Sequence, residues 1–315
     1  MTVTVTAAKV LVVGMDGVRF DRLTASRPPV LTDLMACGAY GTSLLPYGVP
    51  GDADGVVGVA YSDSGPGWST VVTGVWPDKH GVTDNGFASP DYANYPDFLT
   101  RAKSVRPGLT TAAVVSWGHL ARYGTLGARI DARVHFDGDR DGYADCDRLV
   151  VETAERWLGP GDHDPDAVFV YFGSTDEVAH EVGPLGEDYR EALLRQDGYL
   201  GRLLDAIRAR ESFPDERWTV LVTTDHGHRD EGGHGGVTVA EREVFVVLAE
   251  VEGLEGHLGE HAPGLDNPRL VDIAPTVLHR LGIPIEPAWG LDGVPLPGPG
   301  TARSRTGSAR AGSPG

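Results

Sequence analysis

The sequence has little cysteine, methionine and lysine: 2, 3 and 3 of its 315 residues. The two cysteines, Cys37 and Cys146, are too few for the disulfide framework that stabilises small secreted domains. Basic side chains are outnumbered, because 27 lysines and arginines stand against 45 acidic residues, which gives a formal charge of −18. This surplus argues against binding of long nucleic acids or of anionic membranes. A small phosphate ester is still compatible with it, because bound cations reverse the local sign.

Long apolar runs are absent too, and no stretch reaches the roughly 20 residues of a transmembrane helix. The first residues lack the basic segment and long apolar segment of a signal peptide. We therefore expect a cytoplasmic protein with no membrane partner and no nucleic acid polymer as a partner. Hydrophobic residues make up 41% of the chain, which is enough for a large core. Nothing in the sequence indicates an oligomeric state.

Short apolar runs alternate with amphipathic stretches along the chain. Buried strands are predicted at residues 10–13, 42–45, 111–117, 167–172, 219–223 and 244–249, and helices at 29–37, 68–75, 95–103, 148–158, 187–210 and 270–281. This alternation predicts an α/β fold with a mostly parallel central sheet and helices on both faces. We expect one domain at residues 1–300, with a small cap or side lobe in the less regular stretch 86–165. Residues 301–315 have the composition of a disordered tail.

The stretch from Tyr61 to Asn85 contains the candidate nucleophile. Its Ser-Gly-Pro-Gly segment predicts a turn that leads into an apolar helix at 68–75. Backbone N–H groups in the first turn of a helix have no helical partner and favour an anion. Ser64 would lie in this field, and Asn85 would donate a side-chain N–H to the same anion. The alternative is an ordinary loop with a serine in its turn.

Acidic residues and histidines follow three of the predicted strands. They are Asp16, Asp176, His180, Asp225, His226 and His234. The carboxyl ends of parallel strands meet at one edge of a sheet, where open α/β proteins bind ligands, so we expect these side chains to lie together. Mixed Asp and His ligands suit Zn²⁺ or Mn²⁺ better than Ca²⁺ or Mg²⁺. Six ligands are too many for one tetrahedral ion and favour two divalent metal ions. Taken alone, Asp16 is equally compatible with a helix N-cap.

In these motifs the chain resembles the alkaline phosphatase superfamily, and most of all its nucleotide pyrophosphatase/phosphodiesterase branch. The matching pieces occur in the family's order and span about nine-tenths of the chain. They are MDG at Asp16, TG at Thr73, P-x-x-H-G at Pro77, DN at Asp84, D-x-x-x-H at Asp176, DHG at Asp225, HG at His234 and DIAPT at Asp272. Each piece is weak alone, whereas the ordered set is specific.

The resemblance implies an alkaline phosphatase-like fold and a two-metal phosphodiesterase that cleaves a small phosphodiester, such as a nucleotide derivative. It implies one metal held by Asp176, His180 and His234 and a second held by Asp16, Asp225 and His226. Ser64 would be the nucleophile at the metal centre, where it becomes phosphorylated or nucleotidylated, and Asn85 would bind a non-bridging phosphate oxygen.

Two features depart from the family pattern. The branch often has threonine as its nucleophile where Ser64 stands here. Its last histidine usually follows a long insertion, whereas His234 comes nine residues after Asp225. The pocket that selects the leaving group is therefore expected to differ.

Other activities on the same scaffold remain as alternatives. A phosphomonoesterase or phosphonate hydrolase is the main one, although a dianionic phosphate needs extra positive charge. The few lysines are not placed near Ser64, and Arg229 is the cation that could supply that charge. Sulfatase maturation requires an arginine where Trp68 stands. Phosphoglycerate mutases match poorly around Ser64, membrane-bound phosphoethanolamine transferases need transmembrane helices, and a metal-binding module without catalysis is the non-enzymatic alternative.

Overall fold

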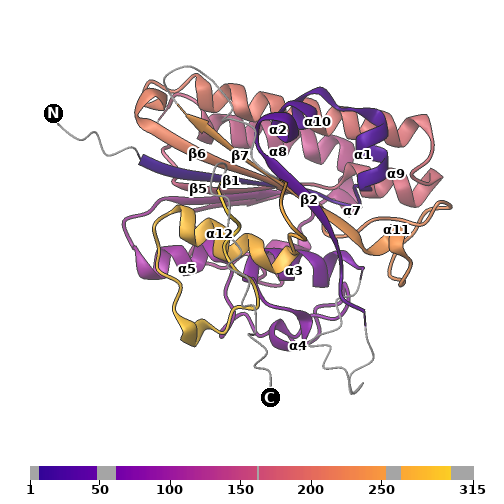
Figure 1. The fold of residues 1–315 in the computed structure, drawn as a ribbon, viewed down its shortest axis with the longest axis horizontal. Helices are drawn as coiled ribbons and strands as arrows, with labels where there is room; N and C mark the ends of the chain where they lie inside the picture. The colour runs from indigo at the N-terminus through magenta and orange to yellow at the C-terminus, as the bar shows by residue number, and fades with distance from the viewer. Residues whose placement is uncertain (1–6, 48–61, 162, 253–263, 299–315) are drawn as a thin grey trace, which may run out of the picture.

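The computed structural model describes residues 7–47, 62–161, 163–252 and 264–298. The expected tail at 301–315 and most of the Gly- and Asp-rich loop before Ser62 lie outside these ranges. The described residues form a seven-stranded sheet with helices on both faces (Figure 1). None of the helices in these ranges combines the length and apolar character needed to cross a membrane.

The sheet is mixed but mostly parallel. In sheet order its strands are β2 (Ala39–Leu44), β7 (Glu243–Glu252), β6 (Glu216–Thr223), β1 (Ala7–Met15), β5 (Ala167–Phe172), β3 (Thr111–Val115) and β4 (Ala132–His135). Strand β7 runs antiparallel to both of its neighbours, whereas the pairs from β6 to β4 are all parallel. The predicted α/β class is confirmed, and the reversed direction of β7 and the short strand β4 were not predicted.

Helices cover the sheet in two layers. One layer holds α1 (Phe20–Ser26), α2 (Pro29–Cys37), α8 (Tyr143–Leu158), α9 (Ser174–Val182) and α10 (Glu187–Arg208), and the other holds α3 (Ser64–Thr73), α4 (Pro77–His80), α5 (Phe98–Val105) and α12 (Ile273–Arg280) (Figure 1). Short helices α6 (His119–Arg122), α7 (Gly138–Asp141) and α11 (Val239–Arg242) and 3₁₀ turns at Phe213–Asp215, Leu270–Asp272 and Pro287–Trp289 complete the described elements.

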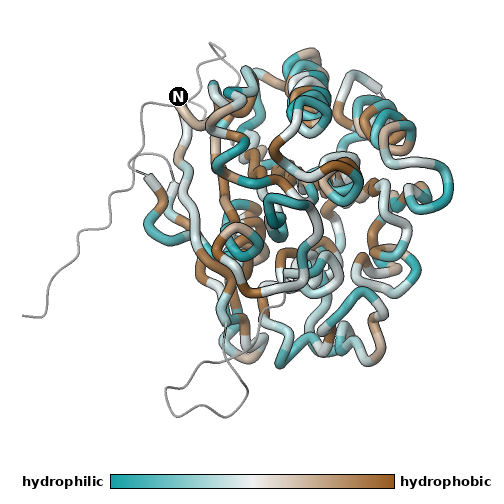
Figure 2. The backbone as a smooth tube through the Cα atoms, turned by 90° about the vertical axis from the view of Figure 1, so that its right-hand side faces the viewer, coloured by the Kyte–Doolittle hydropathy of each residue, from teal (hydrophilic) through white to brown (hydrophobic). Residues whose placement is uncertain are grey.

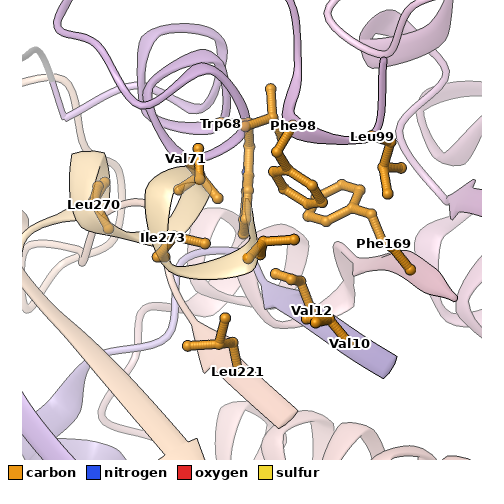
Figure 3. Close-up of a cluster of buried hydrophobic side chains, with 14 of the residues drawn as sticks. Val10, Val12, Trp68, Val71, Phe98, Leu99, Phe169, Leu221, Leu270 and Ile273 are labelled. Atoms are coloured by element: carbon orange, nitrogen blue, oxygen red, sulfur yellow. The ribbon is translucent and has the colours of Figure 1, made fainter. Parts of the chain in front are cut away.

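The two layers explain why β1 is apolar without alternation. Val10 and Val12 join a core cluster with residues of α3, α5 and α12, where Trp68 lies close to Phe169 (Figure 3). Leu11 and Val13 point the other way, into a cluster with α2, α8 and α10. A strand buried on both faces needs apolar residues at every position. Figure 2 shows the same distribution, with hydrophobic segments inside and hydrophilic ones on the outer helices.

We expected a small cap or side lobe in the stretch 86–165. Much of this stretch forms part of the central sheet and of the helical layers. Strands β3 and β4 from this stretch extend the central sheet, and α5 and α8 pack on its opposite faces. Strand β3 agrees with the strand predicted at 111–117, whereas β4 has only four residues and alternates in burial, so its apolar signal is weak. The remainder contains the short helices α6 and α7 and the loops around them.

Candidate functional site

Three adjacent strands bring the predicted residues together. Strand β1 pairs with β5 on one side and with β6 on the other. Asp16 comes directly after β1, Asp176 lies in the first turn of α9 just after β5, and Asp225 and His226 follow β6. All of these positions are at the carboxyl edge of the parallel strands, which is where α/β sheets bind ligands.

One group of side chains surrounds Asp176. Its ligand atoms and those of His180, His228 and His234 lie within 4.8 Å of one another. The Nε2 atoms of His180 and His234 are 2.9 Å apart, and they lie 3.5 and 3.6 Å from the two carboxylate oxygens of Asp176. Three of these residues were predicted as one metal site, and the structure adds His228 to them.

A second group converges on Nε2 of His226. Ser64 Oγ lies 3.2 Å from this nitrogen, Asp225 Oδ2 lies 3.4 Å from it and Asp16 Oδ1 lies 3.5 Å from it. Ligand atoms of Asp16, Asp176 and His226 also lie within 4.8 Å of one another. Asp176 therefore belongs to both groups, so the two candidate metal centres are adjacent and share this carboxylate.

The residues fit divalent cations. Oδ1 of Asp16 and both carboxylate oxygens of Asp225 are buried without a hydrogen-bond partner among the described residues. Such unpaired carboxylates are costly unless a cation binds them. In addition, ligand atoms bound tetrahedrally at zinc with bonds of about 2.0–2.2 Å are separated by about 3.3–3.6 Å. Most of the distances in the two groups are close to that spacing.

The pKa values of these carboxyl groups are raised because the groups are buried close to one another. Burial, followed by repulsion from Asp176, raises the pKa of Asp16 to about 7. Burial and the charges of Asp16 and Asp176 also raise the pKa of Asp225 well above its ordinary value. A cation that binds here would replace protons and remove this repulsion.

The Asp16 carboxylate is oriented by two donors. Its Oδ2 accepts hydrogen bonds from the indole Nε1 of Trp68 at 2.8 Å and from the hydroxyl of Tyr171 at 2.5 Å, which leaves Oδ1 facing the site. Trp68 lies directly over Gly14, where a Cβ would come within 2.4 Å of the ring. Only glycine permits this approach of α3 to β1.

His234 has a similar support on its other ring nitrogen. Nδ1 lies 2.8 Å from the carbonyl oxygen of Ser62 and 3.3 Å from Oδ1 of Asp63, so Nε2 is free to face Asp176 and His180. Burial lowers the pKa of His234, but the hydrogen bond to Asp63 and the charges of Asp176 and Asp16 outweigh it and raise the pKa to about 9. Histidines that bind metals commonly have such a partner on the second nitrogen.

Helix α3 presents the candidate nucleophile. It begins at Ser64, four residues before the predicted start, because proline is accepted in a first turn where its missing N–H has no helical partner. Ser64 is thus the first helical residue rather than part of a preceding turn. Asn85 lies beside it, since its Oδ1 accepts a hydrogen bond from the backbone N–H of Gly65 at 2.6 Å. Asn85 also lines the cavity in front of Ser64.

A cavity of about 380 Å³ opens in front of Ser64 and Asn85. Its lining includes Trp117, Asp139, Tyr143, Tyr171, Asp176, Glu177, His180, Glu181 and His234, and contains no lysine or arginine from the described ranges. Arg229 is half exposed and lies near Glu241 instead. Lys79 donates to Gly290 and forms an ion pair with Asp292. The positive side chains considered from the sequence are therefore directed elsewhere.

Comparison with known families identifies the chain. The sequence model of the type I phosphodiesterase/nucleotide pyrophosphatase family matches residues 10–241, which include every residue of the two groups. The chain belongs to this family. The resemblance stated from the motifs is confirmed, and the fold is that of the alkaline phosphatase superfamily.

Members of this phosphodiesterase family are among the similar curated proteins. An uncharacterised pyrophosphatase/phosphodiesterase of Schizosaccharomyces pombe is 23% identical over 69% of this chain and 44% of its own length. Human ectonucleotide pyrophosphatase/phosphodiesterase family member 1 is 25% identical over 69% of this chain and 23% of its own length. A 2,3-bisphosphoglycerate-independent phosphoglycerate mutase of Rippkaea orientalis is 36% identical, but over only 43% of this chain. The chain spans less than half the length of these relatives.

Solved structures share the fold at low identity. Murine ectonucleotide pyrophosphatase/phosphodiesterase 5 superposes with a TM-score of 0.60 at 15% identity and covers 88% of this chain and 95% of its own. A 2-O GAG sulfatase gives a TM-score of 0.63 at 14% identity, over 92% of this chain and 73% of its own. The shared architecture therefore extends beyond this phosphodiesterase family.

Several residues of this family member's site were not found from the sequence. Neither His228 nor Asp63, which directly precedes Ser64, was assigned a role. The sequence pattern indicated only a place in the core for Trp68 and Tyr171. Their contacts with Asp16 depend on the packing of α3 and β5 against β1, which no local pattern reveals. The close approach of Trp68 to Gly14 is visible only in three dimensions.

Proposed function

We propose that this chain is a metal-dependent phosphodiesterase that cleaves a small phosphodiester through a covalent intermediate on Ser64. The observation that carries the proposal is the convergence of Ser64 Oγ with one oxygen each of Asp16 and Asp225 on Nε2 of His226. A hydroxyl beside buried, unpaired carboxylates is the environment of a nucleophile that shares a cation with them. The family membership supports the same reaction class.

Two divalent ions, Zn²⁺ or Mn²⁺, would complete the site. We assign one to Asp176, His180 and His234 and the other to Asp16, Asp225 and His226 with Ser64. When bound, such ions lower the pKa of a hydroxyl and stabilise negative charge on attacking and leaving oxygens. The unpaired oxygens of Asp16 and Asp225 support this assignment.

The protein's own groups would position the phosphate. Ser64, at the start of α3, attacks phosphorus and the alcohol of the ester leaves, while the amide nitrogen of Asn85 stabilises a non-bridging oxygen. Water then releases the phosphoryl group from Ser64. Two successive displacements give net retention of configuration at phosphorus.

The lining of the cavity favours a diester over a monoester. Asp139, Glu177 and Glu181 border it, and none of its lining residues in the described ranges is a lysine or arginine. A monoester carries a second negative charge that these carboxylates would repel. A nucleotide derivative is a reasonable substrate class, since an inactive variant of the murine relative has been solved in complex with AMP.

The experiment is a comparison of Ser64→Ala and Ser64→Thr with the parent protein on bis(4-nitrophenyl) phosphate and 4-nitrophenyl phosphate, with metal content measured in parallel. We expect Ser64→Ala to lose most activity and Ser64→Thr to keep part of it, because threonine also offers a hydroxyl. The diester should be cleaved faster than the monoester. Retention of configuration with a chiral substrate should accompany these results.

Two outcomes would contradict this proposal: parental activity in Ser64→Ala, or inversion at phosphorus, which means direct attack by water. A strong preference for the monoester would leave Ser64 in its role and transfer the assignment to a phosphomonoesterase.

A further inference from the structure

His228 occupies an unexpected place in the site. It is fully buried in the segment after β6, and its Nε2 lies 2.7 Å from Oδ1 of Asp176. Its ligand atom also falls within the group formed by Asp176, His180 and His234. The side chain is therefore placed either to bind a metal as a fourth ligand or to donate a hydrogen bond to Asp176.

The second ring nitrogen distinguishes these two roles. A neutral histidine that binds a cation through Nε2 carries its proton on Nδ1 and needs an acceptor there. Nδ1 of His226 lies 3.0 Å from the carbonyl oxygen of Gly227, and Nδ1 of His234 lies 2.8 Å from that of Ser62. Nδ1 of His228 is buried and has no partner within the part of the chain that the structure describes.

The energetics follow from this difference. A proton on Nδ1 of His228 is unfavourable, because it would leave a buried N–H without an acceptor and would set the lone pair of Nε2 against Oδ1 of Asp176 at 2.7 Å. With the proton on Nε2, the donor is satisfied by Asp176 and only the lone pair of Nδ1 is unpaired.

The surroundings fix His228 in this position. Arg19 donates from Nη1 to the carbonyl oxygen of His228 at 3.1 Å, and its guanidinium is paired with Asp21 and Asp230. The backbone of Gly17 covers the contact, since a Cβ there would come 2.7 Å from Nε2 of His228 and 2.8 Å from Oδ1 of Asp176. The pair is thus closed in on the side of β1.

We propose that His228 is a positioning residue that donates from Nε2 to Oδ1 of Asp176 and does not itself bind metal. It holds this carboxylate with Oδ2 toward His180, at 3.5 Å from its Nε2. Because Asp176 belongs to both groups, one hydrogen bond orients a ligand that both centres share. This inference rests on the proposed metal-dependent function as far as it treats Asp176 as a ligand.

The test compares His228→Gln, His228→Leu and the ligand control His234→Gln with the parent protein. Glutamine keeps an N–H donor at about the reach of Nε2, whereas leucine removes it. Zinc content and affinity are measured in metal-buffered solution, and the cobalt(II)-substituted proteins are compared by visible absorption. We expect His228→Gln to keep two ions and the parental cobalt spectrum. His228→Leu should bind both ions with roughly 10- to 100-fold lower affinity, and His234→Gln should lose one ion.

A second measurement needs no metal. The ¹⁵N chemical shifts of the His228 ring in the metal-free protein, assigned by their loss in His228→Gln, should show the proton on Nε2. Loss of one ion or a changed cobalt spectrum in His228→Gln would make His228 a ligand and overturn the proposal. So would parental zinc affinity in His228→Leu, or a proton on Nδ1. Failure of the parent protein to bind any ion would instead overturn the proposed function. The ring tautomer would even then show whether His228 donates from Nε2 to Asp176.

Discussion

Asp16 shows how single residues set the geometry of this site. One of its oxygens is held by Trp68 and Tyr171, and the other is left without a partner, so the carboxylate has a defined direction before any ion binds. Residues that orient a metal ligand in this way commonly change metal affinity 10- to 100-fold when they are replaced. Predicted ligands alone therefore describe only part of the site.

Replacing Tyr171 with phenylalanine should lower zinc affinity about 10-fold or more while the fold is retained, because only the hydroxyl that bonds Asp16 is removed. Competition with a chelating dye measures this affinity. Tyr92→Phe is a matched control, since that hydroxyl bonds Ser69 and Thr125 instead. Equal losses of affinity in the two variants would contradict a specific role for Tyr171.

Asn85 accepts a hydrogen bond from the backbone N–H of Gly65 and lines the cavity in front of Ser64. Asn85→Ala should reduce turnover of a diester by roughly 10²-fold or more, because a donor to the phosphoryl group is lost. Asn85→Asp keeps the acceptor for Gly65 but replaces the donor with a negative oxygen, so its loss should be at least as large. Both variants should retain the parental metal content. Unchanged kinetics in either would remove Asn85 from the reaction.

At the scale of elements, α3 shows where sequence patterns mislead. Gly-Pro-Gly is typical of a turn, yet here it forms the first turn of the helix, and Ser64 begins that helix. In contrast, the ends of α2 and β5 agree with the predicted ranges, because Pro29 and an uninterrupted apolar run define them. Local patterns predict the ends of an element well where proline or a continuous apolar run defines them. They predict less well where a glycine is required by close packing between elements, as at Gly14.

The connection between α3 and α4 contains a histidine with a structural role. His80 is buried, its Nε2 pairs with Thr70 and its Nδ1 accepts from the backbone N–H of Val82. Burial lowers its pKa from 6.5 to about 3. Between these values the unfolded chain binds more protons than the folded one, so stability falls as the pH falls below about 6.5.

We therefore expect the parent protein to lose about 1.4 kcal/mol more stability than His80→Asn between pH 7.5 and pH 5.5. Asparagine can still accept from Val82 but does not titrate. Urea denaturation of the metal-free proteins at both pH values measures the difference. His279→Asn, at an exposed position of α12, should behave like the parent. The same loss in His80→Asn as in the parent would show that His80 does not contribute.

At the scale of the whole molecule, the sheet collects negative charge at one edge. In the metal-free protein, the raised pKa of Asp16 adds stability at acidic pH that is lost as the pH rises through about 7. Zinc should act in the opposite direction, because its binding requires the deprotonated carboxylate and removal of the proton that His234 holds up to about pH 9.

Addition of zinc at about 100 times its Kd should raise the stability of the chelated protein by about 2.7 kcal/mol per site. For a chain of this size this corresponds to roughly 5 °C in Tm. At one fixed free zinc concentration the increase should be larger at pH 8 than at pH 5.5, because protons compete with zinc at low pH, and His234→Gln should reduce it. Calorimetry of chelated and zinc-loaded samples provides the measurement. A rise in Tm that does not depend on pH would contradict binding through these residues.

The overall architecture could be predicted only in outline. Alternating elements indicated the α/β class, and the motif order indicated which strand ends meet. The position of β1 between β5 and β6, the reversal of β7 and the place of β3 and β4 in the sheet depend on long-range pairing. No single stretch encodes such pairing, so the sequence predicted a strand at 111–117 without its place in the sheet. His228 was missed for the same reason, since its partner Asp176 comes from another strand end.

The central place of β1 has a consequence for biosynthesis. This strand leaves the ribosome before the other strands of the sheet, but the neighbours on both of its sides, β5 and β6, are made much later in the chain. During translation its two apolar faces and both of its edges are uncovered until the neighbouring strands and helices have been synthesised. Exposed strand edges of this kind are prone to pair with the wrong partner. The three aspartates cannot meet until β6 has been synthesised. The nascent chain should therefore depend on protection of β1, and the ability to bind a metal should mark completed folding.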